Sequence, residues 1–383
     1  MPDLKSMRDI GLFTGISQLD NFANFKNLVP VSRMAPSSMP QEWPQGERIS
    51  LPETYELNGE ERSVEELLKD TSTSALLVLR DGVVRYEQYE NTGGRDVQWI
   101  SMSVGKSFTS ALVGILVDDG KIRSIDDPIS DYIRVEPGSA YDGVSIRAVL
   151  LMSSGARWNE DYNNPESDIK GLTDAMAGDG GDLDDFVARM VREFEPGTVC
   201  RYNSADTQAL GALVRAASGQ SLSDFMQQRL MEPLGFEQDG YWWVDTSGVE
   251  AAFGGLNLVA RDFARLGELY RNGGVWNGTR ILSEEWVRDS TRVTAPQCSP
   301  ESMALPGGVP VIGYGFQWWL PVDEHDSYTA IGVYNQYIHI DPVTNTTIVK
   351  LSANQTYGTL PDEEGDREDE NGAFLFALAK LDF

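Results

Sequence analysis

Strand-like segments at both ends of the chain, separated by a long helical middle, constrain the fold more than any other feature. Near the N-terminus, apolar runs at 74–79 and 83–89 flank Asp81-Gly82, a dipeptide that favours the positive backbone angles of a tight hairpin turn. Further strand-like runs follow after about residue 310, at 314–320, 329–333, 337–340 and 346–351. The economical arrangement is one antiparallel sheet built from both ends of the chain.

The middle of the chain has the periodicity of helices. The run 103–119 places apolar residues at positions 104, 108, 111, 112, 115 and 116, and Gly120 follows as a helix stop. Further helices are predicted at 182–193, 204–217, 221–231, 261–272 and 371–381. Residues 1–50, with several prolines among polar residues, are typical of an irregular arm. The acidic stretch 362–370 is predicted to be a solvated loop.

These elements divide the chain into three parts. An irregular N-terminal arm covers 1–50, an antiparallel-sheet α/β domain combines 51–100 with 285–383, and a mostly helical domain covers 101–284. We therefore predict an α/β (α+β) fold, in which an antiparallel sheet flanked by helices carries an inserted helical domain.

The charge balance argues against several classes of partner. With 31 Lys and Arg against 59 Asp and Glu, the formal net charge is -28, and such a surface repels nucleic-acid backbones and anionic membranes. The first residues lack a basic start followed by an apolar stretch, and no apolar run approaches the roughly 20 residues that span a bilayer. We expect a cytoplasmic protein that binds neither nucleic acid nor membrane.

The residue inventory narrows the chemistry. His325 and His339 are the only histidines, so HExxH and multi-histidine metal sites are excluded, and both are expected to be structural. No Gly-x-Ser-x-Gly sequence provides the nucleophile turn of a Ser-His-Asp hydrolase. Gly105-Lys106-Ser107 imitates the end of a phosphate-binding loop, but Ile100 stands where its first glycine belongs.

What remains is Ser103-Val104-Gly105-Lys106, at the start of a predicted buried helix. Residues three apart share a helix face, so the Lys106 amine can reach the Ser103 hydroxyl. A serine nucleophile needs an adjacent base, and a lysine becomes one only when burial or nearby positive charge lowers its pKa. The helix start also provides a backbone N–H at Ser103 that suits an oxyanion. Against this stands a simpler interpretation, because the tetrad occurs by chance and an N-terminal serine often only caps its helix.

A second segment, 200–206 with Tyr202-Asn203-Ser204, follows a Pro-Gly turn at 196–197. Together with the Ser-x-x-Lys tetrad, it resembles the serine beta-lactamase and penicillin-binding-protein superfamily. Within that superfamily the chain looks like class C beta-lactamases and family VIII carboxylesterases, and more closely like the 6-aminohexanoate-dimer (nylon-oligomer) hydrolase group. The similarity covers most of the chain from about residue 70. Supporting stretches are 102–107, 159–162, 317–319, 331–333 and 348–352.

The resemblance implies a beta-lactamase-like fold and roles for the matching residues. Ser103 would form the acyl-enzyme, and Lys106 and Tyr202 would share the role of general base. The backbone N–H groups of Ser103 and Val333 would form the oxyanion hole. Substrate would be bound by Tyr162, Trp319, Glu160 and Gly332. Tyr162 would reach a leaving amine and Glu160 a cationic substrate terminus, although an exposed surface charge explains Glu160 equally well.

Three departures from the family pattern bear on the substrate. The Lys-Thr-Gly that beta-lactamases carry on the edge strand is replaced by 330–333, Ala-Ile-Gly-Val, so the cation that binds a substrate carboxylate is missing. The tyrosine motif ends in Ser204 rather than the Asn of Tyr-x-Asn. Tyr334-Asn335 stands where the nylon-oligomer group has His-Gly.

We therefore expect a serine hydrolase that cleaves small esters or linear amides through an acyl-serine intermediate, as a carboxylesterase, a 6-aminohexanoate-oligomer-type amidase, or both. Its partner would be a small-molecule ester or amide, and it would need neither cofactor nor metal. A homodimer is a possible oligomeric state. The alternatives are a catalytically silent, penicillin-binding-like protein that only binds ligand, and a D-amino-acid peptidase or beta-lactamase.

Overall fold

A computed structural model describes residues 18–162, 164–178, 180–303, 312–358 and 362–381. Its largest sheet has seven antiparallel strands in the order β11-β12-β13-β14-β15-β4-β5. Strands β4 (Thr73–Arg80) and β5 (Val83–Tyr89) form the predicted hairpin. At its turn φ is 54° at Asp81 and 76° at Gly82, the positive angles that this dipeptide favours.

The C-terminal strands complete this sheet. They are β11 (Ile312–Tyr314), β12 (Trp319–Pro321), β13 (Tyr328–Gly332), β14 (Gln336–Asp341) and β15 (Thr346–Ser352). Thr347 of β15 lies opposite Leu79 of β4, so segments from both ends of the chain share one sheet, as predicted. The single strand predicted at 314–320 is wrong, because the chain reverses between β11 and β12 with a φ of 65° at Gln317.

A second sheet, absent from the sequence prediction, has the strand order β1-β7-β8-β6. Its strands are β1 (Val31–Met34), β6 (Trp99–Ile100), β7 (Gly240–Trp243) and β8 (Leu256–Leu258). The irregular arm predicted for 1–50 is therefore wrong over part of the described chain: β1 pairs with β7, some 200 residues later, and a pairing so distant leaves no local signal. Two small hairpins are formed by β2 (Thr54–Leu57) with β3 (Glu60–Ser63) and β9 (Val275–Trp276) with β10 (Thr279–Arg280).

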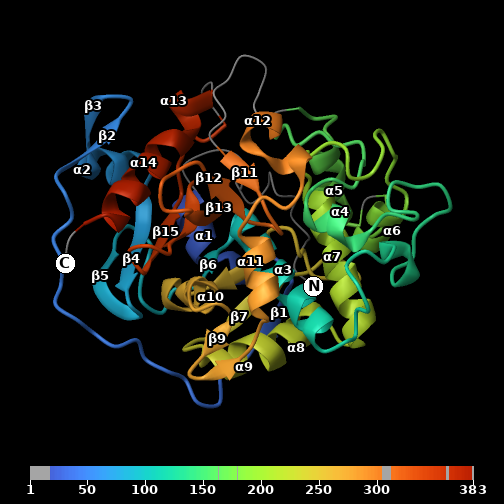
Figure 1. Ribbon diagram of the computed structural model, residues 1–383, viewed down its shortest axis with the longest axis horizontal. Helices are drawn as coiled ribbons and strands as arrows, with labels where there is room; N and C mark the ends of the chain where they lie inside the picture. Colours follow the sequence, from blue (N-terminus) through green and yellow to red (C-terminus); the bar gives the residue numbers. More distant parts are fainter. Residues whose placement is uncertain (1–17, 163, 179, 304–311, 359–361, 382–383) are drawn as a thin grey trace.

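Helices pack on both faces of the large sheet. The helices are α1 (Gln18–Ala23), α2 (Val64–Asp70), α3 (Gly105–Asp118), α4 (Ile146–Leu150), α5 (Asp168–Met176), α6 (Leu183–Ala188), α7 (Ser204–Ser218), α8 (Leu222–Met226), α9 (Glu232–Leu234), α10 (Ala260–Arg271), α11 (Glu284–Ser290), α12 (Pro300–Met303), α13 (Asp362–Asp366) and α14 (Glu368–Ala379). Figure 1 shows α4 to α7 gathered on one side of the molecule and β4, β5 and α14 on the other. The fold is thus α+β, with helices α3 to α12 inserted between strands β5 and β11 of the large sheet.

The two faces of the sheet bury different residues because side chains alternate along a strand. On one face Leu77 and Ile338 join the main core with Leu266 of α10. On the other face Val78 and Ile348 pack under α14 with its apolar residues Phe374, Leu375 and Leu378. Within the described ranges, no helix is long and apolar enough to cross a membrane.

Three predicted elements have different bounds. The helix expected from 103 begins at Gly105, after a 3-10 turn over Met102–Val104, and the helix expected at 182–193 ends at Ala188. The stretch 362–370 is not a loop: it forms α13 and the first turn of α14. Acidic residues at a helix N-terminus are favoured by the helix dipole, and Arg367 pairs with Glu370, so the negative charge is compatible with helix.

Candidate active site

Ser103 lies at the junction of two structural units. Strand β6 of the four-stranded sheet ends at Ile100, and the 3-10 turn that contains Ser103 leads directly into α3. The edge of β13 approaches this turn closely. A Cβ atom added to Gly332 would lie 2.9 Å from the Ser101 carbonyl oxygen and 3.0 Å from the Ser103 nitrogen, so only glycine allows this approach.

Lys106 lies directly behind Ser103, in the first turn of α3. Its Nζ donates to Ser103 Oγ at 2.8 Å, to Ser204 Oγ at 3.0 Å and to the Phe253 carbonyl oxygen at 2.7 Å. The side chain is fully enclosed, with 2% of the residue exposed. Burial lowers the pKa of Lys106 to about 8, and the negative charge of Glu160 limits that decrease. An appreciable fraction of the amine is therefore neutral near pH 7 and able to accept a proton.

Tyr202 forms the adjacent wall. Its ring stacks on Trp319 with centroids 5.1 Å apart and an interplanar angle of 27°, and Lys106 Nζ lies 5.0 Å from the ring centroid. The next residue, Asn203, caps α7 by accepting a hydrogen bond from the Ala205 N–H, which fixes where the motif turns into helix. Burial, followed by the charge of Glu160, raises the pKa of Tyr202 well above its ordinary value, while a hydrogen bond to Ser103 acts in the opposite direction. The phenol therefore stays protonated.

Glu160 is hydrogen-bonded within the site. Its carboxylate accepts from Ser204 Oγ at 2.6 Å, from the Ser204 N–H at 3.2 Å, from the Tyr162 hydroxyl at 3.1 Å and from the Trp158 indole. Lys106, Ser204 and Glu160 thus form a continuous chain of hydrogen bonds. Glu160 is half-buried, and the structure places it against the tyrosine motif rather than on an open surface.

Ser204 is the site residue that sequence reasoning missed. In the sequence it only marks a departure from the Tyr-x-Asn pattern. In the structure its hydroxyl accepts from Lys106 and donates to Glu160, so it links the candidate base to a carboxylate. The available signal was its position, two residues after Tyr202, where the family pattern has a polar side chain facing the lysine. No local sequence pattern predicts that the Phe253 carbonyl accepts a hydrogen bond from Lys106, because the two residues are 147 positions apart along the chain.

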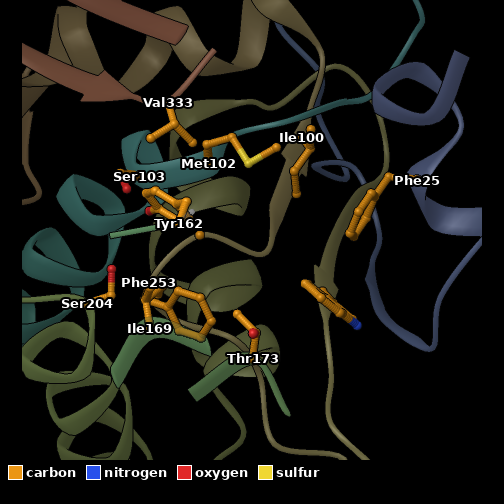
Figure 2. A pocket seen from close by; sticks show the side chains of 12 residues that line it. Phe25, Ile100, Met102, Ser103, Tyr162, Ile169, Thr173, Ser204, Phe253 and Val333 are labelled. Atoms are coloured by element: carbon orange, nitrogen blue, oxygen red, sulfur yellow. The ribbon is translucent and has the colours of Figure 1, made fainter. Parts of the chain in front are cut away.

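Two spaces open beside Ser103. The smaller is a narrow pocket of about 30 Å³ on one side of Ser103. Its walls are largely apolar and include Phe25, Ile100, Met102, Ile169, Trp243 and Phe253. Figure 2 shows Ser103 and Phe25 on opposite sides of this pocket, with Tyr162 and Val333 beside the serine.

The larger space is a cavity of about 680 Å³ that also reaches Ser103. It is lined by Tyr202, Trp319 and Glu160 near the serine, and it continues along β13 and β14 beneath α14. Ser103, Tyr162 and Val333 line both spaces. The structure therefore brings together every residue singled out as catalytic or substrate-binding, with Gly332 packed against the Ser103 turn.

The two histidines lie away from Ser103. His325 Nδ1 is 2.6 Å from Asp341 Oδ2, and His339 is buried beside Thr329 in the far part of the large cavity. Among the described residues, no group of three or more His, Cys, Asp or Glu side chains is arranged to hold a metal ion.

The chain is similar to known proteins both in sequence and in structure. The family model for beta-lactamase matches residues 61–373. Over 296 residues the chain is 32% identical to 6-aminohexanoate-dimer hydrolase of Paenarthrobacter ureafaciens, an alignment that covers 76% of this chain and 75% of the relative. It is 30% identical over 217 residues to penicillin-binding protein 4 of Amycolatopsis lactamdurans, covering 48% and 53%. The solved structure named "Putative 6-aminohexanoate-dimer hydrolase from Bacillus anthracis" superposes with a TM-score of 0.83 at 24% identity, over 95% of this chain and 94% of that one.

Proposed function

Because the chain belongs to the beta-lactamase family of serine hydrolases, we propose that it cleaves small esters and linear amides through an acyl-Ser103 intermediate. The observation that carries this proposal is the 2.8 Å contact from Lys106 Nζ to Ser103 Oγ, made by an amine whose pKa burial lowers to about 8. A lysine in that state can remove the serine proton, which is what a hydroxyl nucleophile requires.

In the acylation step Ser103 Oγ attacks the substrate carbonyl while its proton passes to Lys106. The backbone N–H groups of Ser103 and Val333 stabilise the negative charge that develops on the carbonyl oxygen. Tyr202, whose pKa is raised well above its ordinary value, acts as a proton donor rather than as a phenolate base. It donates to the leaving oxygen or nitrogen and is reprotonated from Lys106, and the ester or amide bond breaks.

Deacylation runs through the same groups in reverse. Water attacks the acyl-serine carbonyl, Lys106 and Tyr202 receive its proton, and Ser103 Oγ leaves with a proton returned to it. The products are a carboxylic acid and an alcohol or amine. Lys106 and Tyr202 are each hydrogen-bonded to Ser103, and none of these steps requires a metal or an organic cofactor.

Short-chain esters are the first substrate class that we propose. A pocket of about 30 Å³ on the apolar side of Ser103 suits an acyl chain of a few carbons, and an alkoxide leaves more easily than an amine. Linear amides are the second class. They are supported by the 32% identity to a 6-aminohexanoate-dimer hydrolase and by the hydroxyl of Tyr162, which lines both spaces beside the serine.

The test is hydrolysis of 4-nitrophenyl acetate and butyrate by the wild type, Ser103→Ala and Tyr202→Phe. We expect Ser103→Ala to lose at least about 10³-fold in kcat/KM and Tyr202→Phe roughly 10²-fold. Ser110→Ala, which removes another buried hydroxyl from the same helix, is the matched control and should stay within twofold. Intact-mass analysis after treatment with a fluorophosphonate should show one adduct in the wild type and none in Ser103→Ala.

Two results would favour the other functions. If the wild type neither turns over nor forms the adduct, the chain only binds ligands. If a chromogenic cephalosporin is hydrolysed faster than 4-nitrophenyl acetate, beta-lactam chemistry is the better assignment. Against the latter, none of the described residues that line either space is Lys or Arg, so a beta-lactam carboxylate meets no cation there.

A further inference from the structure

The two spaces beside Ser103 differ in charge. Only one of them is lined by Tyr202, and this difference assigns each space to one half of a substrate. Tyr202 lines the large cavity and is not part of the small pocket. The leaving group must depart on the side of its proton donor, so it occupies the large cavity and the acyl group occupies the small pocket. This step rests on the proposed function, because it takes Tyr202 as the donor.

The acyl side carries no charge. None of the described residues that line the small pocket is Asp, Glu, Lys, Arg or His, and its volume of about 30 Å³ suits a small group. A charged end group placed there would lose its hydration without gaining a partner, which is strongly unfavourable. The acyl group is therefore short and neutral.

The leaving-group side carries negative charge. Glu160 lies beside Ser103, Asp323 lies at the far part of the cavity, and Glu368 and Asp369 lie at the start of α14. Among the described residues, the donors to Asp323 are the His325 and Ser327 N–H groups and the Ser327 hydroxyl, and those to Glu160 are likewise neutral. Neither Glu160 nor Asp323 forms an ion pair with a described residue. The charge of Glu160 already acts on Lys106, so Asp323 is the carboxylate available to a cation in the cavity.

A buried imidazole gives an independent indication of a ligand. His339 is 3% exposed and lines the same cavity, yet its Nε2 has no hydrogen-bond partner among the described residues. Its Nδ1 lies 2.9 Å from Thr329 Oγ1. Burial lowers the pKa of His339 to about 4, so the ring is neutral at pH 7. In the tautomer that donates from Nδ1 to Thr329, Nε2 is an acceptor that suits an N–H of a bound ammonium group.

We propose that the natural substrate joins a short, neutral acyl group to a linear leaving group that carries a positive charge, which the cavity binds between Asp323, Glu368 and His339. The class comprises acyl esters of amino alcohols and N-acylated diamines or polyamines. This charge order is opposite to that of a 6-aminohexanoate dimer, whose acyl half ends in an amine and whose leaving half ends in a carboxylate.

The reaction balances without a further reactant. Ser103 Oγ bonds to the acyl carbon, the C–O or C–N bond breaks, and the serine proton reaches the leaving atom through Lys106 and Tyr202. The cationic alcohol or amine departs. Water then cleaves the acyl-serine ester, releasing the short carboxylic acid and restoring the Ser103 hydroxyl.

Three acetates with the same acyl group test this charge preference: 5-(dimethylammonio)pentyl acetate, whose protonated nitrogen keeps one N–H for His339, pentyl acetate and 5-acetoxypentanoate. At low ionic strength we expect kcat/KM to be at least tenfold higher for the cation than for the anion, with the neutral ester between them. The preference should weaken in molar salt, since exposed charges are screened. Equal values, or a preference for the anion, would overturn the proposal while leaving the serine mechanism in place.

Variants of the cavity locate the effect. Asp323→Asn keeps an oxygen for the turn hydrogen bonds but removes the charge, and His339→Asn keeps a polar atom near Thr329 but removes Nε2. Each should lower the ratio of the cationic to the neutral ester several-fold, mainly through KM for the cation. Glu136→Gln, an equal loss of charge at an exposed position outside the cavity, is the matched control and should leave the ratio unchanged. If it lowers the ratio as much as Asp323→Asn, overall charge and not the cavity sets the preference, and the proposal fails.

A binding measurement separates this inference from the hydrolase proposal. Calorimetry on Ser103→Ala compares the two leaving groups alone, 5-(dimethylammonio)pentan-1-ol and 5-hydroxypentanoate. Tighter binding of the cation supports the cavity assignment even if no ester is turned over. Equal binding, or tighter binding of the anion, overturns it even if 4-nitrophenyl esters are hydrolysed.

Discussion

Lys106 and Lys350 are both buried, and their surroundings look alike at first. Each amine donates to two hydroxyls: Lys106 to Ser103 and Ser204, Lys350 to Ser352 at 2.7 Å and Thr71 at 3.2 Å. Each also lies over a tyrosine ring, with Nζ 5.0 Å from the Tyr202 centroid and 5.9 Å from the Tyr337 centroid. Burial lowers the pKa of both amines. A buried lysine beside a serine therefore occurs twice in this fold.

The difference lies in the charges and the space around the two pairs. Glu160 offsets part of the desolvation of Lys106, so its pKa stays at about 8, whereas the charge of Arg367 adds to desolvation and lowers the pKa of Lys350 well below its ordinary value. Ser103 opens onto two cavities, while Ser352 is fully enclosed between the large sheet and its covering helices. An amine–hydroxyl pair becomes a candidate for catalysis only when a substrate can reach it and a carboxylate keeps the base near the working pH.

Replacing each lysine by methionine is the strongest test of this comparison. Lys106→Met should lower kcat/KM for 4-nitrophenyl acetate by at least about 10³-fold, since it removes the base that activates Ser103. Lys350→Met should leave kcat/KM within threefold, because the change lies in the opposite core of the sheet. Steady-state kinetics on folded protein, checked by circular dichroism, decide the matter. A large loss in a well-folded Lys350→Met variant would contradict the comparison.

Sequence reasoning found Lys106 because its partner lies three residues away. The spacing of Ser103 and Lys106 brings the two side chains together in a helix, and it does so equally through the 3-10 turn that the structure has there. The large sheet was predictable for a similar reason, since alternation and the Asp81-Gly82 turn are local signals. Membership of the beta-lactamase family rests on the order of several such local segments along the chain.

What the sequence did not show depends on contacts between distant segments. Lys350 and Thr71 are 279 residues apart, and nothing in the strand-like run 346–351 indicates that its lysine is buried beneath α14. The pairing of β1 with β7 and the link from Ser204 to Glu160, 44 residues away, are of the same kind. Such contacts follow from packing, for which a single sequence carries no period or motif.

The serines that contact the two lysines, Ser204 beside Lys106 and Ser352 beside Lys350, extend the comparison. Their replacement should change kcat less than replacement of the lysines. Ser204→Ala removes an acceptor from Lys106 and breaks its link to Glu160, so we expect kcat for 4-nitrophenyl acetate to fall about 10- to 100-fold, which corresponds to about 1.4–2.7 kcal/mol. Ser352→Ala, the counterpart beside Lys350, should leave kcat unchanged. Equal kcat values for the two variants would show that Ser204 only fills space.

The dependence of stability on pH reports on Lys350 directly. Its folded pKa is lowered from the ordinary value of 10.5, so between those two values the unfolded chain binds a proton that the folded chain lacks. The free energy of unfolding must then rise with pH, by up to about 1.4 kcal/mol per unit for one such group, and fall as pH drops toward the folded pKa. Lys350→Met should lose this contribution to the slope on the acid side of pH 10.5, measured by urea denaturation. Parallel curves for the variant and the wild type would mean that the pKa of Lys350 is not lowered in the folded protein.

Glu160→Gln removes the negative charge that distinguishes the surroundings of Lys106 from those of Lys350. Of the substitutions around Lys106, it should change the kinetics least. The negative charge of Glu160 raises the pKa of Lys106, so its removal lowers that pKa and neutral lysine forms at lower pH. The acid limb of kcat/KM against pH should therefore move to lower pH, by about half a unit to one unit, equivalent to roughly 0.7–1.4 kcal/mol. Glutamine keeps an oxygen for the Ser204 hydroxyl, and Glu136→Gln controls for the loss of overall charge. An acid limb that stays in place, or moves to higher pH, would mean that the group titrating in the free enzyme is not Lys106. The two lysines would then differ only in whether a substrate can reach them.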